Sequence, residues 1–444
     1  MLLFMHVQSH SAYDNSKPIR ETYVFFLGQS IIAYASAEHS APASSDQSMT
    51  IVLSLIVMVA TAYLLAHFVV EFLQRRWLFV SGAEYIILGI GLAAIGVLPD
   101  PERYTTAVVF AIGWASIDFG LNTNLRQMLS QPGYETRIAV VDSLCTIACC
   151  SIGTAMLFYI MSGSTDYHWD SAIVIGCIAG TGSHGAIEVV QNRFPNIQTR
   201  ILPTLSSASS LSNVITIAAF TAAVCLFHSD ATGVLEASPS TWGWITIGVG
   251  IGLGLLFSAF LSGESNENAK FLAVTGIICF AAGAAYYLDL SIVGVLALLG
   301  LVLGSTAHGS ELQPVMKGAR QPVTILLLAF AGLFWSTTDF TLVVIGSIAY
   351  FSLRLIGKIL GSWLSSSGTS LRSDLFRGTM AQGPLAIAMA LSMRLMFEGE
   401  FIAISYDVAL IVIAINEVLS ARMLRGLLVD AGEIREDLQT RRGA

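Results

Sequence analysis

The sequence predicts an all-α polytopic membrane protein, and its composition already excludes most other classes. Of the 444 residues, 54% are hydrophobic and only 12% are charged, whereas soluble domains average about 45–50% and about 25%. A disordered chain would be poor in hydrophobic residues, so disorder is excluded as well. The net charge of −8 argues against a nucleic-acid partner, because such binding needs a basic face.

Apolar runs between polar or charged breaks predict thirteen transmembrane helices, since each span needs about 20 largely apolar residues. Their expected ranges are 50–73, 80–98, 104–122, 137–161, 171–190, 201–228, 241–263, 269–288, 290–305, 321–338, 341–363, 376–397 and 404–425. The six cysteines all fall inside these ranges. We expect them to pack as small apolar residues, with no metal site and no disulfide.

Lysine and arginine positions predict the orientation, because cytoplasmic loops are enriched in both residues. With thirteen spans, sixteen of these residues fall on one side, and the opposite loops hold only Arg103 and Arg394. We therefore expect an integral protein of a bacterial inner (plasma) membrane, with its N-terminus outside and its C-terminus in the cytoplasm.

Residues 1–49 form an expected extracytoplasmic N-terminal segment. Lys17 and Arg20 precede a short apolar stretch at 23–34, and Ala35-Ser36-Ala37 has the A-x-A pattern that signal peptidase reads. A signal peptide cleaved near residue 37 fits this pattern. A disordered leader, or a start codon placed too far upstream, fits it equally well.

Two pairs of segments indicate an internal repeat. WASIDF at 114–119 matches WSTTDF at 335–340, and GTGSHGAI at 180–187 matches GTMAQGPL at 378–385. The first pair lies seven spans apart, so its two copies cross the membrane in opposite directions. The sequence thus predicts 6+1+6 inverted repeats: 50–228, a linker helix at 241–263, and 269–428, followed by a cytoplasmic tail at 429–444.

The second pair of segments also predicts two discontinuous helices. Glycines cluster at 180–185, and glycines with a proline cluster at 378–384, at matching places in the two halves. Such breaks mark the midplane site of transporters with inverted repeats, because freed backbone groups are tolerated only where they line a cavity or bind a solute. Small residues that let helices pack closely are the alternative, but the paired placement favours two breaks.

Several segments, taken in order, resemble the monovalent cation–proton antiporter superfamily (sodium/hydrogen exchanger-like). They are AHFVVEFLQRRWLFVSGAEYIILGIGL, IDFGLNTNLRQML, YLDLSIVGVLALLGLVLG, FAGLFWSTTDF, LRLIGKILGSWL and LFRGTMAQGPLAIAMAL. The likeness runs along nearly the whole chain. It implies an antiporter-like fold with two crossing discontinuous helices, a homodimer formed through a panel of helices, and exchange of a monovalent cation (Na⁺ or K⁺) for protons.

The chain departs from the family at its acidic ion ligands. Thr181 is kept, but Gly182 stands where the family usually has an aspartate. Asn213 is kept, but Val214 replaces the carboxylate that usually follows it. The resemblance therefore implies an atypical midplane site.

Polar residues at membrane depth are the candidates for an ion and proton pathway, because a charge there costs about 2.5–3.5 kcal/mol on insertion scales. The candidates are Thr181, Ser183, His184, Glu188, Asn213, Arg354, Gln382 and Glu417.

Among them, His184 is the expected proton carrier, since histidine titrates near neutral pH. The alternative is a neutral histidine that bonds to freed carbonyls, which its counterpart Gln382 favours. Glu188 is expected either to pair with His184 or to face the cytoplasmic funnel.

Two basic residues on the helix at 341–363 receive different predictions. Arg354 is expected to contact the crossing of the two broken helices, with Glu417 or Glu188 balancing its charge. Lys358, one turn further on, is expected to reach the cytoplasmic interface. Asp142 is expected near that interface too, in a water-accessible, structural position.

The leading function is secondary transport of a monovalent cation against protons, without a cofactor. A non-coupled membrane partner or sensor subunit is one alternative, and a proton-coupled anion carrier is the other, favoured by Arg354 and the missing carboxylates. An enzyme is not expected, because no convergent nucleophile, base and metal set is found.

Overall fold

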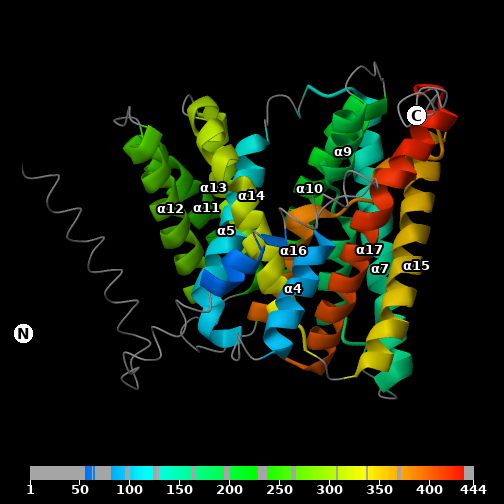
Figure 1. Cartoon of the computed structure of the whole chain (residues 1–444), viewed down its shortest axis with the longest axis horizontal. Helices are drawn as coiled ribbons and strands as arrows, with labels where there is room; N and C mark the ends of the chain where they lie inside the picture. Colours follow the sequence, from blue (N-terminus) through cyan, green and yellow to red (C-terminus); the bar gives the residue numbers. More distant parts are fainter. Residues whose placement is uncertain are drawn as a thin grey trace, which may run out of the picture. The chain divides into compact units, whose positions relative to one another are not determined.

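Every regular element in the described part of the computed structural model is a helix (Figure 1). The described residues are 56–62, 64–65, 82–95, 101–123, 128, 130–162, 167–194, 201–228, 238–261, 267–306, 309–336, 339–367 and 372–434. The predicted N-terminal segment, its signal peptide, most of the first predicted span and the end of the tail lie outside these residues.

The helices keep the labels of Figure 1. They are α4 (Ala83–Ala94), η2 (Pro101–Tyr104), α5 (Thr105–Asn122), α7 (Gly133–Ser162), α8 (Trp169–Gly180), α9 (Gly185–Arg193), α10 (Ile201–Leu226), α11 (Pro239–Leu261), α12 (Glu267–Tyr287), α13 (Ile292–Ser305), α14 (Gly309–Leu333), α15 (Phe340–Ser366), η3 (Leu375–Gly378), α16 (Gly383–Met396) and α17 (Glu400–Asp430).

Each of the twelve spans predicted between 80 and 425 has a helix at its place. Eight helical segments among the described residues are long and apolar enough to cross a membrane, and α4, α13 and α16 are shorter apolar helices. The protein is therefore an integral membrane protein with an all-α fold, as predicted.

Two predicted spans are interrupted, and these are the two expected from their glycines. The span at 171–190 is divided into α8 and α9 by residues 181–184, and the span at 376–397 is divided into η3 and α16 by residues 379–382. The largest boundary error is in α14, which begins at Gly309 although the sequence predicted a start at 321. Its first turns are polar and contain Pro314, so hydropathy alone assigned them to a loop.

Glycines determine how closely several helices approach each other. A Cβ on Gly120 of α5 would overlap the carbonyl oxygen of Ala297 and lie 2.7 Å from the amide nitrogen of Leu301, both on α13. On α15, a Cβ at Gly357 would lie 2.8 Å from the Cα of Thr146, and one at Gly361 would lie 2.6 Å from the Cα of Asp142. Figure 1 shows α15 running along α7, the helix that carries Thr146 and Asp142.

We expect Gly120→Ala to destabilise the protein, because the added methyl group meets rigid backbone on α13. Overpacking of this kind costs about 1–3 kcal/mol. Gly252→Ala on α11 is the matched control, since nothing lies within 4 Å of its Cβ position and alanine favours a helix by about 1 kcal/mol over glycine. Thermal unfolding in detergent should separate the two variants; equal melting temperatures would contradict the close packing of α5 on α13.

Candidate functional site

The first break follows α8, where the chain becomes extended at Thr181. Its backbone groups are paired mainly by α10. The Gly182 N–H donates to Asn213 Oδ1 at 2.8 Å, and Ser212 Oγ donates to the carbonyl of Gly180 at 3.1 Å. The Thr181 hydroxyl donates to the carbonyl of Ile178 at 2.8 Å. The helix can therefore stop inside the protein without leaving these groups unpaired.

The second break precedes α16 and is paired by α17. The N–H groups of Gln382 and Gly383 donate to Glu417 Oε1 at 3.1 and 2.6 Å. Asn416 Nδ2 donates to Gln382 Oε1 at 2.8 Å. Gly383 has a φ of +71°, which favours glycine. Glu417 thus places a carboxylate at the N-terminus of α16, where the helix dipole stabilises a negative charge.

Arg354 joins the two breaks and is fully buried. Its Nε donates to the carbonyl of Ala179 at 3.0 Å, Nη1 to that of Met380 at 3.0 Å, and Nη2 to that of Thr181 at 3.3 Å. Gln382 Nε2 adds a link to the first broken helix, donating to the carbonyl of Ile178 at 3.2 Å. The two breaks are therefore held against each other by side chains.

The predicted contact of Arg354 with the crossing is present, and Glu417, one of the two carboxylates expected to balance its charge, acts on it electrostatically without a direct ion pair. Among the described carboxylates, none forms an ion pair with Arg354, and Glu188 is exposed on α9. Glu417 bonds to backbone N–H groups instead. The guanidinium is stabilised by carbonyls at the C-terminal end of α8, which carries the negative end of the helix dipole.

The remaining candidates lie around the first break. Ser183 and His184 are half-buried, and the Gly185 N–H donates to Ser183 Oγ at 3.1 Å. His184 Nε2 lies 3.1 Å from the carbonyl oxygen of Ser206 and 3.2 Å from Ser210 Oγ, both on α10. The possible pairing of Glu188 with His184 is not found among the described side chains. A role of these residues in a pathway stays a prediction.

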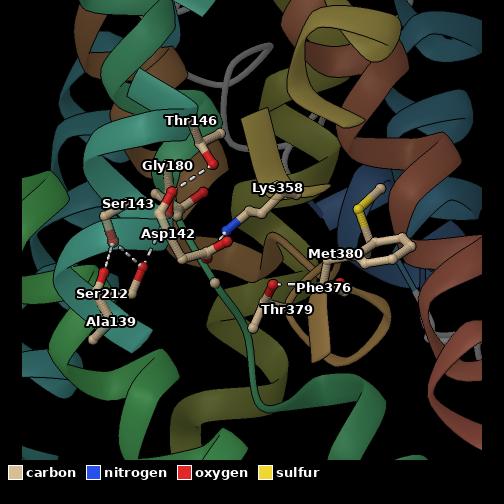
Figure 2. Close-up of polar contacts among 12 residues, drawn as sticks. Ala139, Asp142, Ser143, Thr146, Gly180, Ser212, Lys358, Phe376, Thr379 and Met380 are labelled. Atoms are coloured by element: carbon tan, nitrogen blue, oxygen red, sulfur yellow. Dashed lines mark hydrogen bonds and ion pairs between the residues drawn. The ribbon is translucent and has the colours of Figure 1, made fainter. Parts of the chain in front are cut away.

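A buried ion pair next to the crossing was missed. Lys358 Nζ lies 2.6 Å from Asp142 Oδ2, and the two side chains are 0% and 4% exposed (Figure 2). The predicted interfacial position of Lys358 and the water-accessible position of Asp142 are therefore wrong. Gly357 and Gly361 bring α15 so close to α7 that Lys358 meets a carboxylate instead of water.

Asp407 on α17 is a second buried carboxylate that was missed. It accepts hydrogen bonds from the backbone N–H and the hydroxyl of Ser336, each at 3.2 Å. These two hydrogen bonds connect Ser336, which follows α14, to α17. The signal in the sequence was a lone aspartate inside an apolar run.

The start of the second broken helix is anchored to the end of α17 outside the apolar segments. Arg372 donates to both oxygens of Asp374, at 2.9 and 2.8 Å, and these bonds lower the pKa of that carboxyl. Arg372 also donates to the carbonyl of Asp430 at 3.1 Å, and Arg377 forms an ion pair with the Asp430 carboxylate at 2.5 Å.

We expect Arg354→Ala to destabilise the protein by about 3 kcal/mol or more, because three buried carbonyls lose their donor and each unpaired group costs about 1–3 kcal/mol. Arg320→Ala is the matched control. Its half-exposed ion pair with Asp118 should contribute about 1 kcal/mol or less. Thermal unfolding in detergent measures both variants, and an Arg354→Ala protein that melts together with wild type would contradict this role.

No protein-family profile matches the chain, and no curated protein sequence matches it. Among solved structures, it is similar to the sodium proton antiporter MjNhaP1 from Methanocaldococcus jannaschii at pH 8. The identity is 13% and the TM-score 0.63, over 86% of this chain and 98% of that one. An electron-microscopy structure of the same antiporter is 13% identical, with a TM-score of 0.58 over 85% of this chain and 96% of that one. This chain therefore has a cation–proton antiporter fold, which is the fold of a secondary transporter.

Proposed function

We propose that this membrane protein is a secondary transporter that exchanges a monovalent cation for protons at an atypical site. The observation that carries the proposal is the pair of broken helices, which Arg354 links while Asn213 pairs the first break and Glu417 the second. Broken helices at the midplane are where transporters bind their ions. The fold shared with a sodium proton antiporter supports the same function.

One further feature of the proposal, the inverted repeat, rests on how the breaks are paired. α10 pairs the first break through Asn213, and α17 pairs the second through Glu417 and Asn416. This correspondence supports the predicted inverted repeat. The homodimer, the identity of the ion, the bacterial inner membrane and the orientation remain part of the proposal.

His184 is the residue that we propose carries the proton between solvent and the crossing. Its Nε2 lies within hydrogen-bonding distance of the Ser206 carbonyl oxygen and of Ser210 Oγ. Nδ1 has no hydrogen-bond partner among the described residues. Ser183 and Glu188 complete the proposed pathway, Glu188 at its exposed end.

The anion-carrier alternative loses its main support. It was motivated by a positive charge free to bind an anion, yet Arg354 donates to three carbonyls and Lys358 is paired with Asp142. The alternative of a non-coupled membrane partner or sensor subunit is tested by measuring whether the protein transports ions at all.

The protein reconstituted in liposomes with an internal pH dye, and challenged with a panel of salts, tests the proposed function. We expect proton movement with Na⁺, K⁺ or Li⁺, and none with choline. A response to an anion alone would favour the anion carrier. The absence of any response would favour the partner or sensor subunit.

We expect His184→Gln to abolish pH-dependent cation exchange and to leave thermal unfolding unchanged. Glutamine keeps a donor for the Ser206 carbonyl but cannot take up a proton at neutral pH. Proton flux in the same liposomes measures the effect. Coupled flux at the wild-type rate would eliminate His184 as the proton carrier.

A further inference from the structure

The seam between α14 and α17 carries buried polar bonds at a distance from the crossing. The Tyr406 hydroxyl donates to the carbonyl oxygen of Ala331 at 2.7 Å, and the Asp407 carboxylate accepts the two hydrogen bonds from Ser336. Tyr406 and Asp407 are both fully buried. Asp407 lies about two turns from the start of α17, and Figure 1 shows that start at the end of the bundle opposite to the C-terminus.

These bonds pair backbone groups that the end of α14 leaves free. The Trp335 N–H donates to the carbonyl of Gly332, so the Ala331 carbonyl lacks its usual partner within the helix. The Tyr406 hydroxyl supplies that partner. Asp407 does the same for the N–H of the residue that follows Trp335. The end of α14 is therefore satisfied only while α17 lies against it.

The seam separates two groups of helices that are held together in different ways. α8, α10, α15, α16 and α17 are joined by the buried polar bonds around the two breaks. α4 and α14 are joined through glycines, since a Cβ at Gly332 would overlap the carbonyl oxygen of Ile86. α14 is also joined to α5 by the ion pair of Arg320 with Asp118. Motion between the two groups at this end therefore breaks the bonds between α14 and α17.

Arg394 on α16 is a second partner for Asp407 that this structure leaves unused. It is half-buried in the last turn of α16, and its Nε is buried with no hydrogen-bond partner among the described residues. The guanidinium is close enough to act on the Asp407 carboxylate electrostatically, yet the two form no ion pair in the described part of the chain. A buried donor without a partner is unfavourable, so its position requires a reason.

We propose that Asp407 is a latch with two partners, bonded to Ser336 of α14 while the seam is closed and to Arg394 of α16 while the seam is open. This inference rests on the proposed exchange function, because exchange requires that the crossing be reached from each side of the membrane in turn. The structure has the closed arrangement at this seam.

The change of partner keeps a buried charge paired in both states. If α17 moves away from α14, Asp407 loses both hydrogen bonds from Ser336, and a buried carboxylate left alone is strongly unfavourable. Arg394 belongs to the same group of helices as Asp407, so it stays beside the carboxylate as the seam opens. An ion pair can then replace the two hydrogen bonds, and no proton is gained or lost.

The latch acts on the helix that pairs the second break. α17 carries Asp407 at the seam and Glu417 ten residues further on, where Glu417 accepts the N–H groups at the start of α16. α16 carries Arg394 in its last turn. Both partners of the open state therefore lie on the two helices that form the second half of the crossing, and the seam opens with the crossing as one unit.

Exchange in liposomes and thermal unfolding in detergent, measured on the same full-length variants, test the inference. We expect Arg394→Gln to slow exchange about tenfold or more, because the open seam would leave the Asp407 carboxylate unpaired. Its melting temperature should stay close to that of wild type, because Arg394 does not bond to Asp407 while the seam is closed. A merely structural arginine would instead lower both.

A second substitution should restore exchange. A neutral amide needs no counter-charge, so Asp407→Asn and Asp407→Asn/Arg394→Gln should exchange at the same rate, faster than Arg394→Gln alone. Ser336→Ala/Arg394→Gln is an independent route, which also decides the matter if Asp407→Asn does not fold. Loss of one hydrogen bond from the closed seam should raise its rate several-fold above that of Arg394→Gln.

Arg320→Gln is the matched control. It removes an arginine from the half-exposed ion pair with Asp118, on helices that do not contain the latch residues Asp407 and Arg394, and should exchange as wild type does.

Three results would overturn the latch and leave the proposed function intact. They are wild-type exchange in Arg394→Gln, slow exchange that neither second substitution restores, and loss of exchange in a folded Asp407→Asn protein, which would mean that the carboxylate itself is needed. If wild type moves no protons with any cation, the proposed function fails, and the latch fails with it.

Discussion

The pairing of free backbone groups at membrane depth is the constraint on which the rest of this structure depends. With no water available, every N–H and C=O that a broken helix releases must find a partner within the protein. Here those partners come from α10, α15 and α17. The positions of these three helices relative to the two breaks are therefore tightly restricted, because each helix must bring its side chains within hydrogen-bonding distance of the free backbone groups.

Arginine is the residue best suited to link the two breaks. Its planar guanidinium carries five donors and remains charged, so one side chain can serve carbonyls of both broken helices at once. Arg354 uses three of its nitrogens in this way. A lysine has a single nitrogen at the end of a flexible stem and cannot reach carbonyls so far apart. Arg354 and Lys358 therefore differ in role although they lie one turn apart on α15.

Composition and hydropathy were sufficient to predict the class of fold and twelve spans, because membrane helices must be long and apolar. The paired glycines predicted the two breaks, and Gly383 adopts a φ of +71° that favours glycine. The sequence did not predict the surroundings of Lys358, Asp142 and Asp407, because hydropathy does not tell which neighbouring helix a given helix face contacts. Whether a lysine reaches water or meets a carboxylate depends on the neighbouring helix, and Gly357 and Gly361 reveal a close approach without revealing the partner.

The charges around the crossing suit the proposed exchange better than they would suit simple cation transport. Arg354 and Lys358 are balanced by Asp142 and Glu417, and all four side chains are buried. Arg354 and Glu417 are each bonded to backbone groups of the two breaks. Asp142 and Lys358, by contrast, are bonded to each other through their side chains. Because an additional positive charge there would be uncompensated in a low-dielectric interior, the proposed entry of a cation fits exchange for a proton better than uptake alone.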